Sequence, residues 1–324
     1  MIYRSLLRFV QLALPVAAAT AAPDVWAEGL PPEVGYNYGE IETPRIAALG
    51  GANRAFSNSL EALFVNPASM AAARVYHIGA LAQIWPEANR QSYGAGAVDS
   101  IVSSTGLAGG IGGTWNTQDP DDLGRQYTDV RFAFAFPFSK QFLLGAGGRY
   151  VSLTQDGLGP FGSSLASGGL DGERIVKTVG FDAGVTVKPS PEFSLALVGN
   201  NLTNPGNGFL PASIGGGAGF GNENLTIEGD FVTDFTTWNE TTVRGMAGLE
   251  FLAADRYPLR IGYRYDEGAK SHAVSGGLGY VDRTFGAEIA VRRVVSGDTA
   301  TTVVLGFSYH LEAAGLTPQA GDTF

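Results

Sequence analysis

The sequence contains no cysteine, so no disulfide can stabilise the fold. It also has no long hydrophobic runs: after residue 27 the apolar stretches are interrupted at every second or third position, far short of the ~20 residues that a membrane-spanning helix needs. Basic residues are scarce, with 21 Lys and Arg against 31 Asp and Glu, and the net charge is −10. An acidic chain of this kind argues against nucleic acid as a partner, because phosphates need a basic surface.

Catalytic motifs are missing as well. Although 46 residues are glycine, no phosphate-binding or dinucleotide-binding glycine pattern occurs, and neither His-Glu-x-x-His nor Gly-x-Ser-x-Gly is present. The three histidines, His77, His272 and His310, do not have the spacing of metal ligands. We therefore expect no enzymatic activity, no cofactor and no metal site.

The first 27 residues have the composition of a secretory signal. Arg4 and Arg8 precede an apolar, alanine-rich run from residue 9 to 22, and Val25-Trp26-Ala27 offers small residues where a signal peptidase reads. Cleavage after Ala27 is expected, and a site after Ala21 or Ala22 is the alternative. Either site sends the mature chain out of the cytoplasm.

From Val75 onward the dominant pattern is alternation with period two, which indicates strands with one apolar face. In the stretch 130–138, phenylalanines at every second position lie opposite Arg131, Ala133 and Ala135. Counting such runs predicts fourteen strands, allowing an error of two, each long enough to cross a bilayer when tilted. They span 75–85, 91–102, 107–116, 127–138, 142–154, 174–188, 193–203, 212–221, 225–235, 241–252, 258–265, 271–281, 284–294 and 301–311.

The predicted connections differ in length on the two sides. Those after even-numbered strands are mostly tight, such as 139–141 and 282–283, whereas 117–126, 155–173 and 204–211 follow odd-numbered strands and are longer. Short periplasmic turns and long outer loops are typical of outer-membrane barrels. A soluble sandwich or propeller is the alternative, but it predicts neither this asymmetry nor phenylalanines on an outer face. The predicted fold class is all-β, a transmembrane antiparallel barrel of about fourteen strands in the outer membrane.

Residues 28–74 lack the alternation. This segment precedes the first strand and is long enough to fold back into the pore as a hatch, or plug. The expected division is therefore 1–27 signal peptide, 28–74 hatch, 75–311 barrel and 312–324 periplasmic tail.

The hatch carries a family resemblance. It contains Arg45-x-x-x-Leu49-Gly50-Gly51-Ala52, then Glu61-Ala62-Leu63-Phe64, then Asn66-Pro67-Ala68. These runs resemble FadL-type hydrophobic-compound transporters and their PorV-like relatives over residues 45–70, and the rest of the chain resembles them only in architecture. The resemblance implies that Phe64, Asn66, Pro67 and Ala68 contact or gate a ligand. Read from the residues alone, Asn66 and Pro67 form a capping turn that orders the plug.

The implied function is a passive outer-membrane channel for small hydrophobic molecules, with exit downward or sideways through the wall. The alternative is a PorV-like accessory or structural barrel that binds a protein partner, which the short outer loops favour slightly. Besides lipid and a ligand or protein partner, we expect the barrel-assembly machinery as a partner, because Gly306-x-x-Tyr309-x-Leu311 resembles the terminal-strand signal that it recognises.

Several charged residues fall on the predicted lumen face. Strand pairing should place Glu250 beside Arg260 and Arg244 beside Arg264, and small residues at 273–279 should let the two flanking strands meet. The set forms either an ion-pair network that braces wall and plug, or a cationic patch of Arg244, Arg264 and Arg292 for a carboxylate head group. The residues are Arg131, Arg149, Asp182, Arg244, Glu250, Arg260, Arg264, Glu288 and Arg292.

Glycine clusters at 109–113 and 215–217 allow two interpretations. They mark an inward kink that opens a lateral window, or they make room for the hatch.

Overall fold

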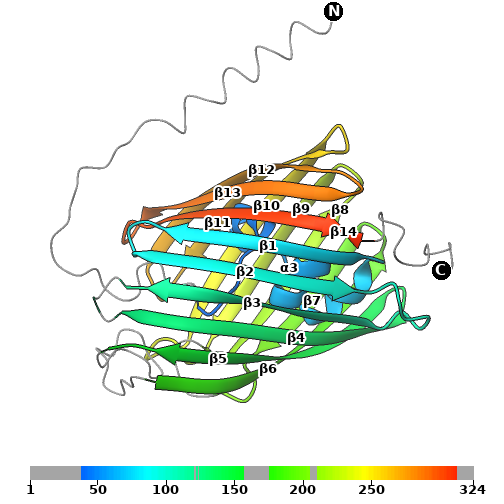
Figure 1. The fold of residues 1–324 in the computed structure, drawn as a ribbon. Helices are drawn as coiled ribbons and strands as arrows, with labels where there is room; N and C mark the ends of the chain where they lie inside the picture. The colour runs from blue at the N-terminus through cyan, green and yellow to red at the C-terminus, as the bar shows by residue number, and fades with distance from the viewer. Residues whose placement is uncertain (1–37, 120–121, 123, 157–174, 205–209, 312–324) are drawn as a thin grey trace, which may run out of the picture.

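The chain folds as a closed antiparallel barrel in which β1 pairs with β14 (Figure 1). The computed structural model describes residues 38–119, 122, 124–156, 175–204 and 210–311. All fourteen strands of the barrel are among them, so the predicted fold class is confirmed. The predicted signal peptide and periplasmic tail lie outside the described residues and stay predictions.

The strands agree with the predicted runs to within three residues at each end. They are β1 Tyr76–Trp85, β2 Arg90–Asp99, β3 Ala108–Gln118, β4 Arg125–Ser139, β5 Phe142–Thr154, β6 Ile175–Ser190, β7 Phe193–Asn200, β8 Ser213–Gly221, β9 Leu225–Asp234, β10 Thr242–Ala253, β11 Tyr257–Asp266, β12 Ser271–Val281, β13 Phe285–Ser296 and β14 Thr301–His310.

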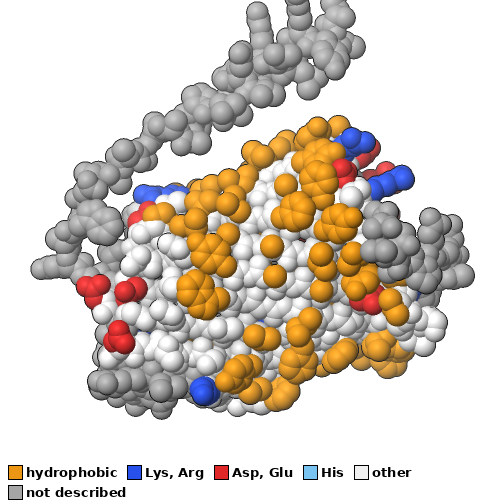
Figure 2. Space-filling view, in the orientation of Figure 1, with side chains coloured by type: hydrophobic (Ala, Val, Ile, Leu, Met, Phe, Trp, Pro, Cys, Tyr) orange, Lys and Arg blue, Asp and Glu red, His pale blue; other side chains and the backbone are white. Residues whose placement is uncertain are grey.

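The period-two alternation separates a lipid-facing surface from the lumen. On β4, Phe132 is 47% exposed whereas Arg131 is 4% exposed, because successive side chains of a strand point to opposite faces. On the face shown in Figure 2, charged side chains gather toward the two ends of the barrel and hydrophobic ones lie between them. This distribution suits a wall surrounded by hydrocarbon.

The connections follow the predicted asymmetry. After even-numbered strands they are mostly short, as at Lys140-Gln141 between β4 and β5 and at Pro191-Glu192 between β6 and β7, with 100–107 between β2 and β3 as the exception. The two longest connections, 155–174 and 201–212, follow odd-numbered strands. We therefore call the end that carries the odd-strand connections the outer end, and the opposite end, where β1 begins and β14 finishes, the periplasmic end.

The described residues before β1, from Tyr38 onward, lie inside the barrel (Figure 1). They form α2 (Pro44–Ala48), α3 (Ser59–Val65) and a 3-10 helix, η1 (Pro67–Ala72). The helix α2 contacts β11–β14, α3 contacts β1–β4, and η1 contacts β3–β6. No helix among the described residues is long and apolar enough to cross a membrane.

Candidate functional site in the barrel lumen

The inner segment, residues 38–74, runs along the lumen and partly back. Tyr38 lies at the outer end with Trp85 and Trp238, and Phe56 packs against the inner face of β8 at Gly219 and Gly221, close to the periplasmic end. The chain then turns into α3, η1 and finally β1. The lumen is therefore filled by the chain's own residues along most of its length.

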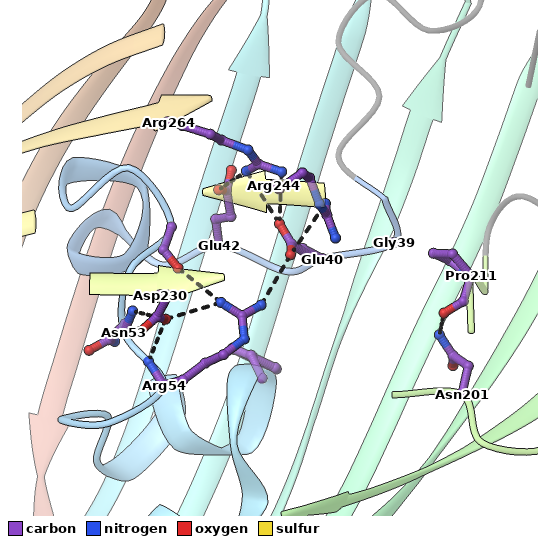
Figure 3. A network of polar contacts seen from close by, with 12 residues as sticks. Gly39, Glu40, Glu42, Asn53, Arg54, Asn201, Pro211, Asp230, Arg244 and Arg264 are labelled. Atoms are coloured by element: carbon purple, nitrogen blue, oxygen red, sulfur yellow. Dashed lines mark hydrogen bonds and ion pairs between the residues drawn. The ribbon is translucent and has the colours of Figure 1, made fainter. Parts of the chain in front are cut away.

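Glu40 is the centre of an ion-pair network that fixes the inner segment to the wall (Figure 3). Its carboxylate lies 3.5 Å from Arg54 Nη2 and 3.6 Å from Arg244 Nη1. Arg264 Nη1 approaches the other carboxylate oxygen to 3.4 Å. Burial alone would raise the pKa of Glu40, but the surrounding arginines outweigh burial and lower this pKa to about 2.

Glu42 continues the network two residues further on. It is buried and accepts hydrogen bonds from both terminal nitrogens of Arg292, at 2.8 Å from Nη2, and it lies 3.7 Å from Arg264 Nη1. The three arginines predicted to receive a carboxylate head group are thus paired with carboxylates of the chain itself. A ligand carboxylate would have to displace Glu40 or Glu42, and a head-group site stays a prediction.

Two acidic residues of β9 hold the backbone of the inner segment. Asp230 Oδ2 accepts hydrogen bonds from the amides of Asn53 and Arg54, both at 3.0 Å, and from Arg54 Nη1 at 3.1 Å. Glu228 Oε1 accepts one from the amide of Ala55. Three successive backbone donors are satisfied in this way, so the chain can be buried there without a helix or strand.

A second chain of ion pairs lies nearer the periplasmic end. Arg45 Nε donates to Glu250 at 3.0 Å, Glu250 also binds Arg260, and Arg260 Nη1 reaches Glu288 at 2.6 Å. Glu250 and Arg260 are direct cross-strand partners. The Arg260–Glu288 contact spans β12 above Gly277 and Gly279, where the wall has no side chains.

One expected neighbour pair is wrong. The register places Arg244 opposite Asp266 and Arg264 opposite Met246, so Arg244 and Arg264 are offset by two residues. The two expected pairs need different registers: the register that pairs Glu250 with Arg260 places Arg244 opposite Asp266, and alternation alone does not choose between registers two residues apart. The two arginines still meet through Glu40 and through Tyr38, whose ring centroid is 4.0 Å from Arg244 and 5.7 Å from Arg264.

The remaining predicted lumen charges are on β4–β6. Asp129 accepts hydrogen bonds from Arg131 at 3.1 Å and Arg149 at 2.6 Å. Arg131 also donates to the Phe64 carbonyl at 2.8 Å, which ties it to the end of α3. Asp182 instead accepts from the Asn201 amide at 2.7 Å and orders the connection after β7.

Asn66, Pro67 and Ala68 form the turn between α3 and η1. The side-chain nitrogen of Asn66, Nδ2, donates to the Arg54 carbonyl and to Thr186 Oγ1, both at 2.8 Å. The side-chain oxygen, Oδ1, accepts from the backbone amide of Ala68 at 3.2 Å. Asn66 caps η1 and Pro67 begins it, which is the capping role read from the residues alone. The turn packs against the backbone of β5 and β6, since a Cβ at Gly145 would be 2.3 Å from Ala68 N. Ligand binding by these three residues stays a prediction.

The other side of the lumen is apolar. We call its buried residues the apolar cluster: Ile41, Ala62, Leu63, Phe64, Met70, Leu81, Val98, Ala108, Ala133 and Ala135. Here α3 covers what we call the glycine row, Gly79, Gly96 and Gly112, which are direct cross-strand neighbours on β1–β3. A Cβ at Gly79 or Gly96 would be within 2.8 Å of Leu60, and one at Gly112 would be 3.2 Å from Leu63.

The predicted glycine clusters serve the same purpose in part. Gly110 faces Met70 and Leu63, and Gly215 and Gly217 face Arg54. Both β3 and β8 pair with their neighbours without a register shift. The described pairing therefore shows room made for the inner segment and no register shift at these glycines.

Comparison with known proteins gives a structural answer only. No family model matches the sequence, and no curated protein matches it significantly. The CymD monoaromatic hydrocarbon channel has a TM-score of 0.65 at 13% identity, covering 85% of this chain and 98% of its own. The Ralstonia pickettii toluene transporter TbuX has a TM-score of 0.60 at 13% identity, covering 85% and 99%. A Pseudomonas aeruginosa FadL homologue has a TM-score of 0.62 at 13% identity, covering 82% and 98%.

This chain has the FadL-type fold. The architecture expected from the resemblance at residues 45–70 is thereby confirmed. At 13% identity the likeness extends to the fold and not to the ligand.

Two spaces flank the inner segment of this FadL-type barrel. The outer vestibule, beside Tyr38, Trp85 and Arg264, has a volume of about 300 Å³. The periplasmic vestibule, beside Glu61, His77 and His310, has a volume of about 310 Å³. The described lumen between them holds only small spaces, of about 20 and 50 Å³. Passage of a molecule between the vestibules requires part of the inner segment to move.

Sequence reasoning missed several residues of these polar networks. Asp129, Glu228 and Asp230 lie on predicted strands, and the residues next to two of them, Val130 and Phe231, face outward. The alternation that identified Arg131 therefore also places these three residues on the lumen face. The partners on the inner segment, Glu40, Glu42 and Arg54, lie in irregular chain without a period, and no comparable signal points to them. Among the described residues, no group of three His, Asp or Glu is arranged to hold a metal ion.

Proposed function

We propose that this protein is a passive outer-membrane channel for small hydrophobic molecules, with the inner segment as its gate. Three observations support the proposal: the FadL-type fold, the hydrocarbon-suited outer surface, and above all the apolar cluster on one side of the lumen. A molecule crossing by this route follows its own gradient, because the route needs only a movement of part of the inner segment away from the apolar wall.

The glycine row indicates where an apolar molecule would pass, which is between α3 and the barrel wall. Leu60 and Leu63 fill a strip of wall that has no side chains of its own. Apolar contacts are non-directional, so an apolar molecule can replace these leucines against the wall without leaving a polar group unsatisfied. The ion-paired side offers no such exchange, because an apolar molecule there would strand buried charges.

The exit proposed is axial, into the periplasmic vestibule. A lateral window would need an interrupted wall, and β3 is hydrogen-bonded to both neighbours without a register shift. The periplasmic vestibule adjoins Leu60 at the start of α3, directly below the glycine row.

Replacing Leu63 tests the proposal. Leu63 is 4% exposed, and a buried Leu→Ala change costs about 2–5 kcal/mol of packing. We expect Leu63→Ala to raise uptake of the neutral dye N-phenyl-1-naphthylamine into proteoliposomes about tenfold or more, since 1.4 kcal/mol changes a population tenfold.

The matched control is Leu197→Ala on the lipid-facing surface, where Leu197 is 55% exposed; it should leave uptake unchanged. Uptake no faster than in protein-free liposomes, for the wild type and both variants, would contradict the channel. That result would favour the alternative, an accessory barrel that binds a protein partner, for which a lumen filled with ion pairs is no obstacle.

A further inference from the structure

Two of the three histidines meet at the seam where the barrel closes. His77 of β1 and His310 of β14 are direct cross-strand partners. Both point into the lumen at the periplasmic end, since their neighbour Ile78 is on the lipid-facing side. Their rings stack with centroids 3.9 Å apart and planes 16° from parallel.

The stacked pair is joined to the gate. His77 Nδ1 lies 2.7 Å from Ser59 Oγ, and Ser59 is the first residue of α3. The φ angle of Ser59 is +49°, in the left-handed region that a residue with a Cβ adopts at a cost. The hydrogen bond to His77 therefore stabilises an unfavourable backbone conformation at the start of α3. The next residue, Leu60, covers Gly79 and Gly96 of the glycine row.

Two of the four carboxylates around the pair are already bound by arginines, so they are only partly available to offset added positive charge on the rings. Glu250 is bound by Arg45 and Arg260, and Glu288 is bound by Arg260. Burial raises the pKa of Glu61, so acid neutralises this carboxylate early. The charged residues that share the periplasmic vestibule with the histidines are Arg45, Glu61, Glu223, Glu250, Arg260 and Glu288.

Imidazole takes up a proton between pH 5 and 8 in ordinary surroundings. Two neutral rings stack favourably, and one added proton leaves a single charge. Two imidazolium rings at this separation repel each other. Acid thus acts against the stacked arrangement at the point where the gate is fastened to the wall.

We propose that the His77–His310 stack is a proton-operated latch, which holds the first turn of α3 when the rings are neutral and releases it when both are charged. This inference rests on the proposed function for its consequence, because release of α3 uncovers the glycine row. The latch itself is argued from the contacts among His77, His310 and Ser59.

Hydrogen exchange of the α3 amides from Ala62 to Asn66 tests the latch directly, in the full-length protein in bilayers. After correction for the intrinsic pH dependence, we expect exchange in the wild type to be about tenfold faster at pH 5 than at pH 8, since one unit of proton affinity is a tenfold change in population. The double variant His77→Gln/His310→Gln should lose this dependence. The control is His272→Gln, which alters a histidine bonded to Tyr263 on the lipid-facing surface and should keep it.

Dye uptake measured on the same samples separates the two proposals. If α3 exchange depends on pH only when both histidines are present but uptake is absent at every pH, the latch stands and the channel fails. If uptake occurs but α3 exchange is independent of pH, or is equally dependent in the double variant, the latch is wrong. The single variants His77→Gln and His310→Gln give the same decision if the double variant does not fold, and each should lose the dependence.

Discussion

The two sides of the lumen hold the same inner segment by opposite means. On one side an ionic anchor, made of Glu40, Glu42, Asp230 and Glu250 with their arginines, fixes the stretch from residue 40 to 55. On the other side α3 and η1 rest in the apolar cluster. Removing one partner of a buried ion pair is costly, because a charge is left without compensation, whereas an apolar contact can be replaced by any apolar molecule of similar size. We therefore expect the ionic side to attach the inner segment to the wall and the apolar side to open.

Among the variants that test this difference between the two sides, Glu40→Gln is expected to have the largest effect on stability. Arg54, Arg244 and Arg264 would lose a shared carboxylate in a buried place, which costs about 3–5 kcal/mol. We expect a lower urea midpoint for exposure of residues 39–43, measured by hydrogen exchange, and faster passage of polar solutes. Glu240→Gln, in the exposed connection between β9 and β10, should change neither. An unchanged midpoint for Glu40→Gln would mean that the ionic anchor is not what attaches the segment.

Acid should weaken the ionic anchor in a lower pH range than the one in which α3 is expected to be released. The pKa of Glu40 is lowered from 4.5 to about 2, so its ionised form contributes about 3 kcal/mol to the folded state. A depressed pKa gives stability that is complete above pH 4.5 and is lost as the pH falls toward 2. Exchange of residues 39–43 should therefore stay constant between pH 8 and 5, where α3 is expected to change. A common transition of both regions would contradict the division into two sides.

The strands could be predicted because the wall separates lipid from the filled lumen. Successive side chains of each strand after Val75 therefore alternate between an apolar outer face and the lumen face. Phe132 and Arg131 differ in exposure for that reason alone, and barrel closure follows because an open sheet edge is not tolerated in hydrocarbon. The same rule reaches Asp129 and Asp230, which alternation could have identified.

The pairing inside the lumen could not be predicted in the same way. Whether Arg264 of β11 lies opposite Arg244 or Met246 of β10 depends on register, which alternation leaves open. Glu40 and Glu42 lie in a stretch shaped by its contacts with β9–β13 rather than by any local period. The Asn66 turn was recognisable, because capping is a local interaction.

The smallest effect, and the sharpest test of how tightly the anchored side fits, comes from two glycines on neighbouring strands. A Cβ at Gly262 of β11 would lie 2.3 Å from the backbone nitrogen of Gly50, whereas a Cβ at Gly245 of β10 meets nothing within 4 Å. Overpacking of this kind typically costs about 1–3 kcal/mol. We expect Gly262→Ala to push residues 48–51 away from β11 and to lower the urea midpoint, and Gly245→Ala to have no effect. Because backbone lies on both sides of the contact at Gly262, no side-chain rotation can relieve it. Equal midpoints for the two variants would show that the anchored side is as free to shift as α3.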